Sequence, residues 1–234
     1  MALSGSKPEW LTFDCYGTLI QWDEGLLAAV SQILAKQTKT TVKARKLIEV
    51  YDKYEHELEQ EPPHRKFREV AGSALELAMK ELGLSYESKD IEILTSGISQ
   101  MPPFHEVPGA LGELKSMGFN LCIISNTDDD IIAGNVAQLS GHIDRVISAE
   151  QAQAYKPSRK AFEFAHRALG VSHSEIVHIC ASPHLDLAAA REMGFRCIWI
   201  DRATGRQPLP NYSPNAVLPR LDGVPRLFQE INWT

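Results

Sequence analysis

The chain alternates short apolar runs with longer amphipathic segments, and this alternation most constrains the fold. The apolar runs are nearly continuous in hydrophobicity: WLTFDC from Trp10, NLCIIS from Asn120, IVHICA from Ile176 and CIWI from Cys197. Such runs are typical of parallel strands that helices cover on both faces. The shorter run RVIS, from Arg145, is a candidate for a fifth strand.

Segments with helical apolar spacing separate these runs. They cover residues 107–118, 126–141, 158–170 and 186–194, and each ends at a glycine, a residue common just past helix C termini. Strands that alternate with helices favour crossover connections between parallel strands. The fold class is therefore predicted to be α/β, with a doubly wound parallel sheet.

The span from Trp22 to about Phe104 interrupts this alternation. It carries helical spacing at residues 26–36, 44–58, 67–83 and 89–98, and no strand pattern is evident within it. We therefore predict an α/β core domain made of residues 1–21 and 105–234. Residues 22–104 would form a helical cap subdomain inserted after the first strand.

Charge and cysteine usage narrow the classes of partner. A net charge of −6 without a Lys/Arg-rich run argues against binding to nucleic acid or to an anionic membrane surface. Cys15, Cys122, Cys180 and Cys197 lie in apolar runs without a CxxC pair, which favours buried thiols over disulfides or a metal site. No apolar stretch approaches the roughly 20 residues of a membrane span, and no secretory signal is evident. We expect a cytoplasmic protein.

Polar residues stand where the predicted strands end. Asp14 closes the first run, Ser125 and Asn126 follow the second, Lys156 follows the RVIS segment, and residues 182–186 follow IVHICA. Ligands of doubly wound sheets bind outside the carboxyl ends of the strands. Buried alone, each of these groups would be costly, but together they can satisfy one another. A small-molecule site is predicted at this edge of the sheet.

The motifs FDCYGTL, ISNTD, YKPSRKAFE and SPHLDLAAAREMGF, in this order, resemble the four motifs of the haloacid dehalogenase superfamily. The branch they resemble is the 2-haloacid dehalogenase type, and the helical insertion lies where that branch carries its cap. The resemblance implies a Rossmann-like core and an aspartate nucleophile. It also implies a small carboxylate substrate and a homodimer formed through the cap.

The position two residues after Asp14 separates the chemistries of this superfamily. The phosphatases that the chain resembles have a second acid there and hold Mg²⁺ through further acids. This chain has Tyr16 at that position, and only Asp186 follows the fourth-motif strand. A lone desolvated carboxylate can instead displace a leaving group from an sp³ carbon, forming an ester that water then hydrolyses. We therefore expect no metal and no cofactor.

The resemblance assigns the catalytic roles to a few polar residues. Asp14 would be the nucleophile, Thr18 would orient it, and Lys156 would stabilise its charge. Asp186 would anchor Lys156 and help to place the hydrolytic water.

The resemblance also assigns the substrate contacts. Ser125 would hold the substrate carboxylate together with backbone N–H groups near Cys15 and Tyr16. Asn126 would face the departing group. Tyr16 and Phe67 would line the apolar part of the pocket, with Phe67 contributed by the cap.

Four positions depart from the dehalogenase pattern, and one of them is Phe162, six residues after Lys156, where the branch has a tyrosine. Ile48 stands where the branch has the arginine that cradles the halide, and Ala181 and Pro183 replace a serine and an asparagine. His184 lies two residues before Asp186 and has two interpretations: a base that activates water, or a partner that caps the next helix. His178, inside an apolar run, is interpreted as a core histidine.

Three functions remain open at this point. The first is hydrolytic dehalogenation of a short (S)-2-haloacid to a 2-hydroxy acid, or the same chemistry on another 2-substituted carboxylate, such as ring opening of azetidine-2-carboxylate. The second is a Mg²⁺-dependent phosphatase of the same superfamily. The third is a non-catalytic protein that keeps the fold.

Overall fold

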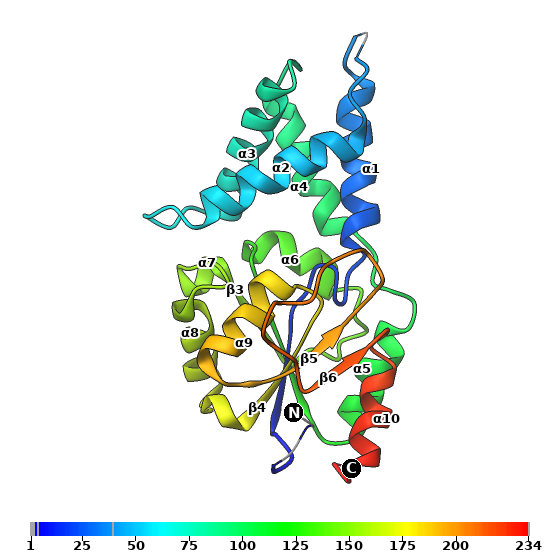
Figure 1. The fold of residues 1–234 in the computed structure, drawn as a ribbon. Helices are drawn as coiled ribbons and strands as arrows, with labels where there is room; N and C mark the ends of the chain where they lie inside the picture. Colours follow the sequence, from blue (N-terminus) through cyan, green and yellow to red (C-terminus); the bar gives the residue numbers. More distant parts are fainter. Residues whose placement is uncertain (1–2, 4, 39, 234) are drawn as a thin grey trace.

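The computed structural model of the chain describes residues 3, 5–38 and 40–233, with Met1, Ala2, Ser4, Lys39 and Thr234 outside the description. The described chain forms a sheet flanked by helices, with a helical layer above its carboxyl edge (Figure 1). Its strands are β1 (Trp10–Phe13), β2 (Asn120–Ser125), β3 (Arg145–Ser148), β4 (Ile176–Cys180), β5 (Arg196–Ile200) and β6 (Ala216–Leu218).

All pairs in the sheet are parallel, and the strand order is β3-β2-β1-β4-β5-β6. The α/β prediction is therefore confirmed. The helices of the core are α5 (Val107–Ser116), α6 (Asp129–Val136), α7 (Ala149–Ala152), α8 (Arg159–Leu169), α9 (Ala188–Met193) and α10 (Gly223–Glu230). A 3₁₀ turn, η1 (His173–Glu175), precedes β4, and a π-helical turn, η2 (Pro183–Leu187), follows it.

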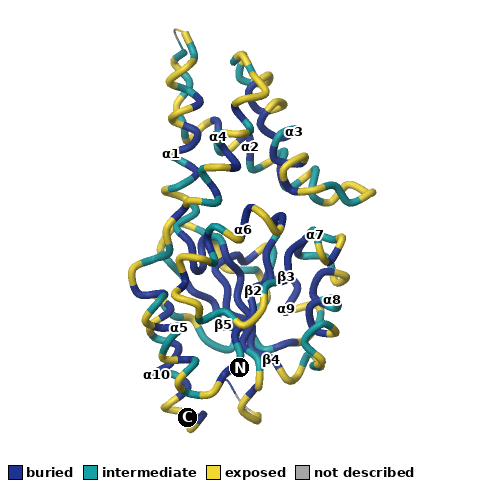
Figure 2. Tube along the Cα trace, turned by 180° about the vertical axis from the view of Figure 1, so that it is seen from behind, coloured by how far each residue is buried: buried dark blue, intermediate teal, exposed yellow. Residues whose placement is uncertain are grey.

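Both faces of the sheet are covered, which explains the continuous hydrophobicity of its strands. In β2, Leu121 and Ile123 belong to the core formed with α5 and α10, whereas Cys122 and Ile124 belong to the core formed with α8 and α9. These helix pairs lie on opposite sides of the sheet (Figures 1 and 2). Because successive side chains of a strand point to opposite faces, every position needs an apolar residue here.

The predictions missed β6 and α10. β6 has three residues, of which none is buried. Such an edge strand carries no apolar run, so its sequence gives little signal.

The helical layer consists of α1 (Trp22–Ala35), α2 (Ala44–Glu59), α3 (Phe67–Glu81) and α4 (Ser88–Gln100). These helices pack α2 against α3 and α1 against α4, and they lie above the carboxyl ends of the strands (Figure 1). The predicted cap helices are thus present, and residues 22–104 remain our proposed limits for the cap. None of the described helices combines the length and apolar character that a membrane crossing requires.

A carboxylate of the core domain binds the N-terminus of a helix in the cap subdomain. Asp128 accepts hydrogen bonds from the backbone N–H groups of Phe67 (2.8 Å) and Arg68 (3.0 Å), at the first turn of α3. These N–H groups have no partner within their own helix, and negative charge is favourable at that end. The contact therefore holds α3 down on the core beside the strand ends.

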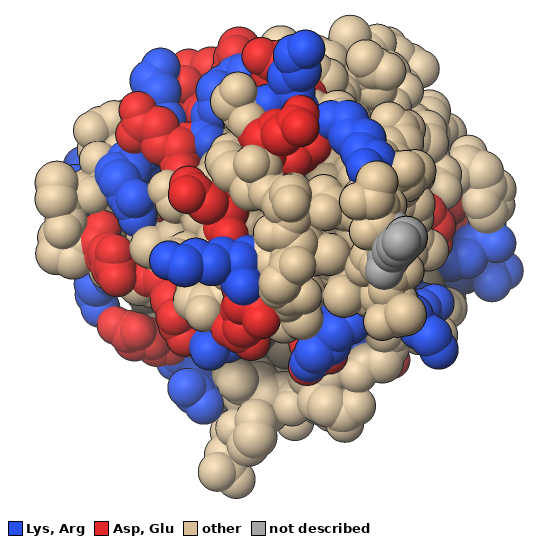
Figure 3. Space-filling view, turned by 90° about the horizontal axis from the view of Figure 1, so that it is seen from above, with Lys and Arg blue, Asp and Glu red and all other residues tan. Residues whose placement is uncertain are grey.

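Charged side chains are mixed on the surface that is seen from above the helical layer. On the described residues of this face, Lys and Arg side chains are interspersed with Asp and Glu (Figure 3). Neither sign of charge is gathered into a single patch on this face.

Candidate active site

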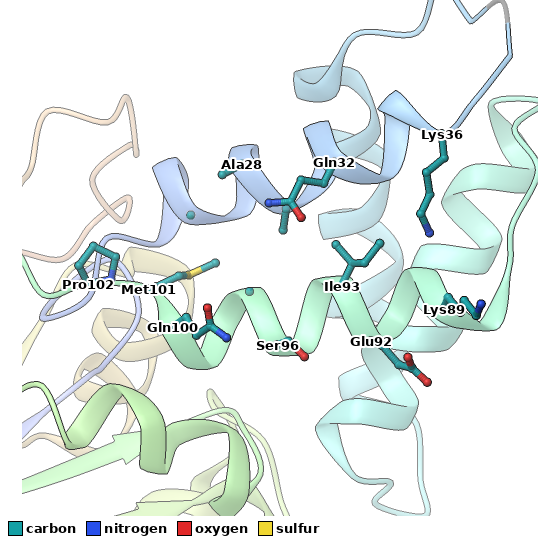
Figure 4. A pocket seen from close by; sticks show the side chains of 13 residues that line it. Ala28, Gln32, Lys36, Lys89, Glu92, Ile93, Ser96, Gln100, Met101 and Pro102 are labelled. Carbon is teal, nitrogen blue, oxygen red and sulfur yellow. The ribbon is translucent and has the colours of Figure 1, made fainter.

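Two cavities border the helical layer. The larger, about 720 Å³, lies between α1 and α4 and is lined by side chains such as Gln32, Lys36, Glu92 and Gln100 (Figure 4). None of the residues predicted for the site lines it. The smaller, about 160 Å³, lies between the cap and the carboxyl ends of the strands and contains Asp14. Chemistry, not volume, identifies the smaller cavity as the candidate site.

A sharp turn after β1 places the predicted nucleophile and its partner together. The backbone turns at Gly17, whose φ of +78° is one that glycine adopts without steric cost. The turn brings the Thr18 hydroxyl back, so that it donates to Asp14 Oδ2 at 2.6 Å. Thr18 Oγ1 in turn accepts from the backbone N–H of Ala181 at 2.8 Å, which fixes its orientation.

Lys156 joins the two aspartates of the site. Its Nζ donates to Asp14 Oδ1 at 2.8 Å and to Asp186 Oδ1 at 2.9 Å. The three side chains are deeply buried: Asp14 is 5% exposed, Lys156 1% and Asp186 not at all. Burial opposes the charge on Lys156, but the two carboxylates outweigh it and raise the pKa of the ammonium above its ordinary value. The pKa of Asp186 is lowered, because Lys156 and His178 outweigh the effect of its burial.

His178 extends this network, a role that the sequence did not indicate. Its Nε2 donates to Asp186 Oδ1 at 3.0 Å, because a carboxylate oxygen bound to Lys156 acts as an acceptor. Its Nδ1 therefore accepts from the Thr12 hydroxyl at 2.9 Å. His178 is a core residue, as interpreted, and it also orients Asp186 from behind.

Four of the five predicted substrate-binding residues line the same cavity, and the fifth, Cys15, is buried and does not line it. Ser125, Asn126, Tyr16 and Phe67 all line it. Ser125 Oγ is buried without a hydrogen-bond partner among the described residues. Within that same part of the chain, the backbone N–H groups of Cys15 and Tyr16 make no hydrogen bond either. Together they form a set of donors that suits a carboxylate.

Asn126 and Tyr16 are engaged elsewhere through their polar ends. Asn126 Oδ1 accepts from the backbone N–H of Lys156 at 2.7 Å, and its Nδ2 donates to Glu59 and to the Lys156 carbonyl. The Tyr16 hydroxyl donates to Asn135 at 2.9 Å. Asn126 therefore holds the backbone of Lys156 in place, and Tyr16 offers the cavity its ring.

His184 lines the cavity, whereas Asp186 does not. Burial lowers the pKa of His184 below its ordinary value of 6.5, with a further contribution from His56. The imidazole is therefore neutral at neutral pH and able to accept a proton. Asp186 is fully buried behind Lys156, which leaves His184 better placed than Asp186 to contact a water molecule in the cavity.

The cap contributes an acidic wall that the sequence analysis missed. Asp52, Glu55, His56 and Glu59 of α2 all line the cavity. Burial raises the pKa of Asp52 to about 6 and that of Glu55 to about 8, and it also raises the pKa of Glu59. Their spacing of three to four residues places them on one face of a helix, a signal that the sequence did contain.

Arg206 is another residue that the sequence analysis missed. It lies in the segment between β5 and β6 and reaches the cavity from the core side. Its guanidinium forms two hydrogen bonds with Asp23, at 3.1 and 3.3 Å. Ile48, at the position where the resemblance implies an arginine, does not line the cavity, and Arg206 is the guanidinium that the described chain offers there.

The donor set does not suit a magnesium ion. Tyr16 stands in place of the second acid, and the Lys156 ammonium already pairs with both Asp14 and Asp186. His178, Cys180 and Asp186 lie close enough to hold a metal. However, His178 Nε2 is a donor to Asp186, and burial raises the pKa of the Cys180 thiol, so it stays protonated.

Comparison with known proteins places this geometry in a family. The sequence profile of the family described as haloacid dehalogenase-like hydrolase matches residues 9–194. The chain belongs to this family. It is thus an enzyme of the hydrolase class, and the superfamily resemblance read from the four motifs is confirmed.

Characterised relatives of this family member align along nearly their whole length. Haloacetate dehalogenase H-2 of Moraxella sp. (strain B) is 28% identical over 224 residues, which cover 95% of this chain and 98% of the relative. The (S)-2-haloacid dehalogenase of Pseudomonas sp. (strain YL) is 28% identical over 228 residues, 94% of each chain. The solved structure of the Xanthobacter autotrophicus L-2-haloacid dehalogenase, with chloropropionic acid covalently bound, superposes with a TM-score of 0.80 at 19% identity. The superposition covers 95% of this chain and 98% of the Xanthobacter chain. The two proteins therefore share a fold.

Proposed function

We propose that this hydrolase displaces a substituent from C2 of a short carboxylic acid through an ester on Asp14, with (S)-2-haloacids as the leading substrates. The observation that carries the proposal is the buried Asp14, held by Lys156 at 2.8 Å and Thr18 at 2.6 Å without a second acid beside it. A cavity of about 160 Å³ lies well below the roughly 300 Å³ at which sites for larger ligands begin. The substrate is therefore small.

The proposed reaction has two steps. The substrate carboxylate binds Ser125 Oγ and the N–H groups of Cys15 and Tyr16, which brings C2 to an oxygen of Asp14. The carboxylate oxygen forms a bond to C2, and the leaving group departs with the electron pair of its own bond. Water then attacks the carbonyl carbon of the Asp14 ester, releasing the 2-hydroxy acid and regenerating the carboxylate.

Burial favours the first step. A carboxylate loses nucleophilicity when water solvates it, and Asp14 is 5% exposed. Lys156 and Thr18 hold both oxygens in place before the substrate arrives, so no reorganisation is needed in the transition state. The 28% identical relatives named for haloacetate and (S)-2-haloacid dehalogenation support this assignment.

The acidic wall favours a second candidate, in which the leaving group is an amine. Asp52, Glu55 and Glu59 face the cavity. Glu55, with a pKa of about 8, keeps its proton at pH 7, burial raises the pKa of Glu59 as well, and Asp52, with a pKa of about 6, is mostly ionised. The Asp52 carboxylate can pair with a ring ammonium, whereas its negative charge opposes a departing halide anion. In azetidine-2-carboxylate, attack of Asp14 on C2 would send the C–N electron pair to the protonated ring nitrogen, which leaves as a neutral amine. The same ester would follow.

One panel separates these functions. Purified protein is incubated with EDTA and either L-2-chloropropionate or azetidine-2-carboxylate, and chloride and the hydroxy acid are measured. Chloride release supports the dehalogenase, whereas conversion of azetidine-2-carboxylate alone supports the amine candidate. Turnover of p-nitrophenyl phosphate that requires Mg²⁺ would contradict both and support the phosphatase.

The ester itself is testable through its atoms. In ¹⁸O-water over multiple turnovers, label should enter the Asp14 side chain, because water attacks its carbonyl carbon. Mass spectrometry of the peptide that contains Asp14 detects the label. Asp14→Asn should abolish both turnover and labelling, and an active Asp14→Asn variant would overturn the proposal. The homodimer implied by the resemblance stays a separate prediction.

A further inference from the structure

A pair of histidines joins the cap to the core beside the candidate nucleophile. His56, on α2 of the cap, places its Nε2 2.8 Å from Nε2 of His184, on η2 of the core. The ring centroids lie 4.8 Å apart, with an interplanar angle of 49°. Both residues line the cavity that contains Asp14.

The hydrogen bonds of His56 determine its tautomer. Its Nδ1 lies 2.6 Å from the backbone carbonyl oxygen of Asp52, one helical turn earlier. A carbonyl oxygen only accepts, so Nδ1 carries the proton, and Nε2 of neutral His56 has a lone pair. The 2.8 Å contact then requires that Nε2 of His184 donates. Neutral His184 must therefore carry its lone pair on Nδ1.

This tautomer leaves a basic nitrogen on the imidazole that borders the cavity. No hydrogen bond to the described residues engages His184 Nδ1, and the residue is exposed, so water can reach this nitrogen. We propose that His184 Nδ1 is the base that accepts a proton from the hydrolytic water, and that His56 is a positioning residue that holds His184 in this tautomer. The inference rests on the ester intermediate of the proposed function.

The proton transfers balance over the second step. The water oxygen bonds to the carbonyl carbon of the Asp14 ester as one water proton moves to His184 Nδ1. The bond between that carbon and the ester oxygen then breaks, and the departing alkoxide takes the proton back from His184 as a hydroxyl group. Asp14 is left as a carboxylic acid, and it releases its proton as it returns to the carboxylate.

The charged groups around the pair keep His184 neutral before the water reacts. Burial and the neighbouring His56, Arg206 and Lys156 disfavour the imidazolium, whereas Asp186 favours it. The titratable and charged groups that border the pair come from α1, α2, the strand ends and the segment after β5: Asp23, Asp52, Glu55, Glu59, Asp14, Lys156, Asp186 and Arg206.

A matched pair of variants at His56 tests the positioning role. The amide of His56→Gln reaches about as far as Nε2 and can accept from His184, whereas His56→Asn carries the same amide one methylene short. We expect His56→Asn to lower kcat by about 10- to 100-fold, the scale of a weakened general base. His56→Gln should stay within about threefold of wild type.

The split between kcat and KM identifies the affected step. Release of the leaving group is irreversible, so kcat/KM reports only the steps up to ester formation. In His56→Asn, kcat and KM should therefore fall together while kcat/KM stays unchanged. The ester should accumulate on the peptide that contains Asp14, and His184→Gln should trap it more completely. The substrate is whichever of L-2-chloropropionate and azetidine-2-carboxylate the wild type converts.

Each other outcome overturns the inference. His56→Asn with wild-type kcat, or with kcat and kcat/KM lowered equally, would show that His56 does not act on ester hydrolysis. A His56→Gln variant as slow as His56→Asn would show that the tautomer is not what His56 supplies. Urea unfolding of each variant establishes that it is folded. If the wild type forms no ester with either substrate, the proposed function itself fails. This result is distinct from a failure of the role of His56, which is read from the variants.

Discussion

Replacing Glu55 with glutamine should raise the free energy of unfolding, and the gain should grow with pH. Glu55 is 7% exposed, and burial raises its pKa from the ordinary 4.5 to about 8. Between these two values the folded protein binds the Glu55 proton, whereas the unfolded chain has released it. The free energy of unfolding then falls by about 1.4 kcal/mol for each unit that pH rises, and it levels off above about pH 8.

The expected gain follows from this difference in proton binding. At pH 7, ionisation of Glu55 in the unfolded chain lowers the free energy of unfolding of the wild type by about 3 kcal/mol. Glutamine has no such ionisation and is close to the protonated acid in shape. It also keeps an oxygen to accept from the Tyr51 hydroxyl, which now lies 2.6 Å from Glu55 Oε1. Glu55→Gln should therefore be about as stable as wild type near pH 4.5 and about 3 kcal/mol more stable at pH 7.

Urea unfolding followed by circular dichroism measures this gain, since urea does not screen charges. The measurement is made at about pH 5, 7 and 8.5, and the difference between the proteins should widen at each step. Glu57→Gln is the matched control, because Glu57 is exposed on the same helix and its change should stay within about 0.5 kcal/mol. Parallel stability curves for wild type and Glu55→Gln would refute the reasoning, because they would mean that Glu55 does not keep its proton on folding.

Three further outcomes follow from the site. Lys156→Met leaves the buried carboxylate of Asp14 without its cation and should cost about 3–5 kcal/mol in urea unfolding along with the activity; a fully active variant would contradict the role of Lys156. Asp128→Ala removes the acceptor of the first N–H groups of α3 and should lower the free energy of unfolding by about 1 kcal/mol, with a raised KM. An unchanged KM would show that this contact does not help to position the cap subdomain over the substrate. In a pH profile, kcat should fall as acid protonates His184, with a midpoint below the ordinary pKa of 6.5; a midpoint above 6.5 would exclude His184 as the base.

Glu55 also shows why stability and function compete at this cavity. A protonated acid in the wall lowers the free energy of unfolding at neutral pH, yet its side chain faces the space above Asp14. If the leaving group is an amine, Glu55→Gln should slow turnover while it stabilises the fold. If the leaving group is a halide, the same variant should stabilise the fold with little loss of rate.

The local pattern was sufficient for the elements that are buried on both sides. Continuous apolar runs predicted β1, β2, β4 and β5, and helical spacing predicted the four helices of the cap. Short or exposed elements such as β6 left no pattern, because their residues are held by contacts with neighbours rather than by their own hydrophobicity. The same apolar runs pointed to Asp14, Ser125 and Lys156, because a polar residue that follows a buried run stands out in the sequence.

The sequence by itself determined an α/β sheet with a helical insertion and a nucleophilic aspartate without a second acid beside it. Only the tertiary structure decided that α2 turns Asp52, Glu55, His56 and Glu59 toward the nucleophile, and that Arg206 reaches the same cavity. Helical spacing fixes which residues share a face, but not what that face meets. The pKa values near the cavity depend on burial and on charges brought from distant segments, and these arise only when the cap packs on the core.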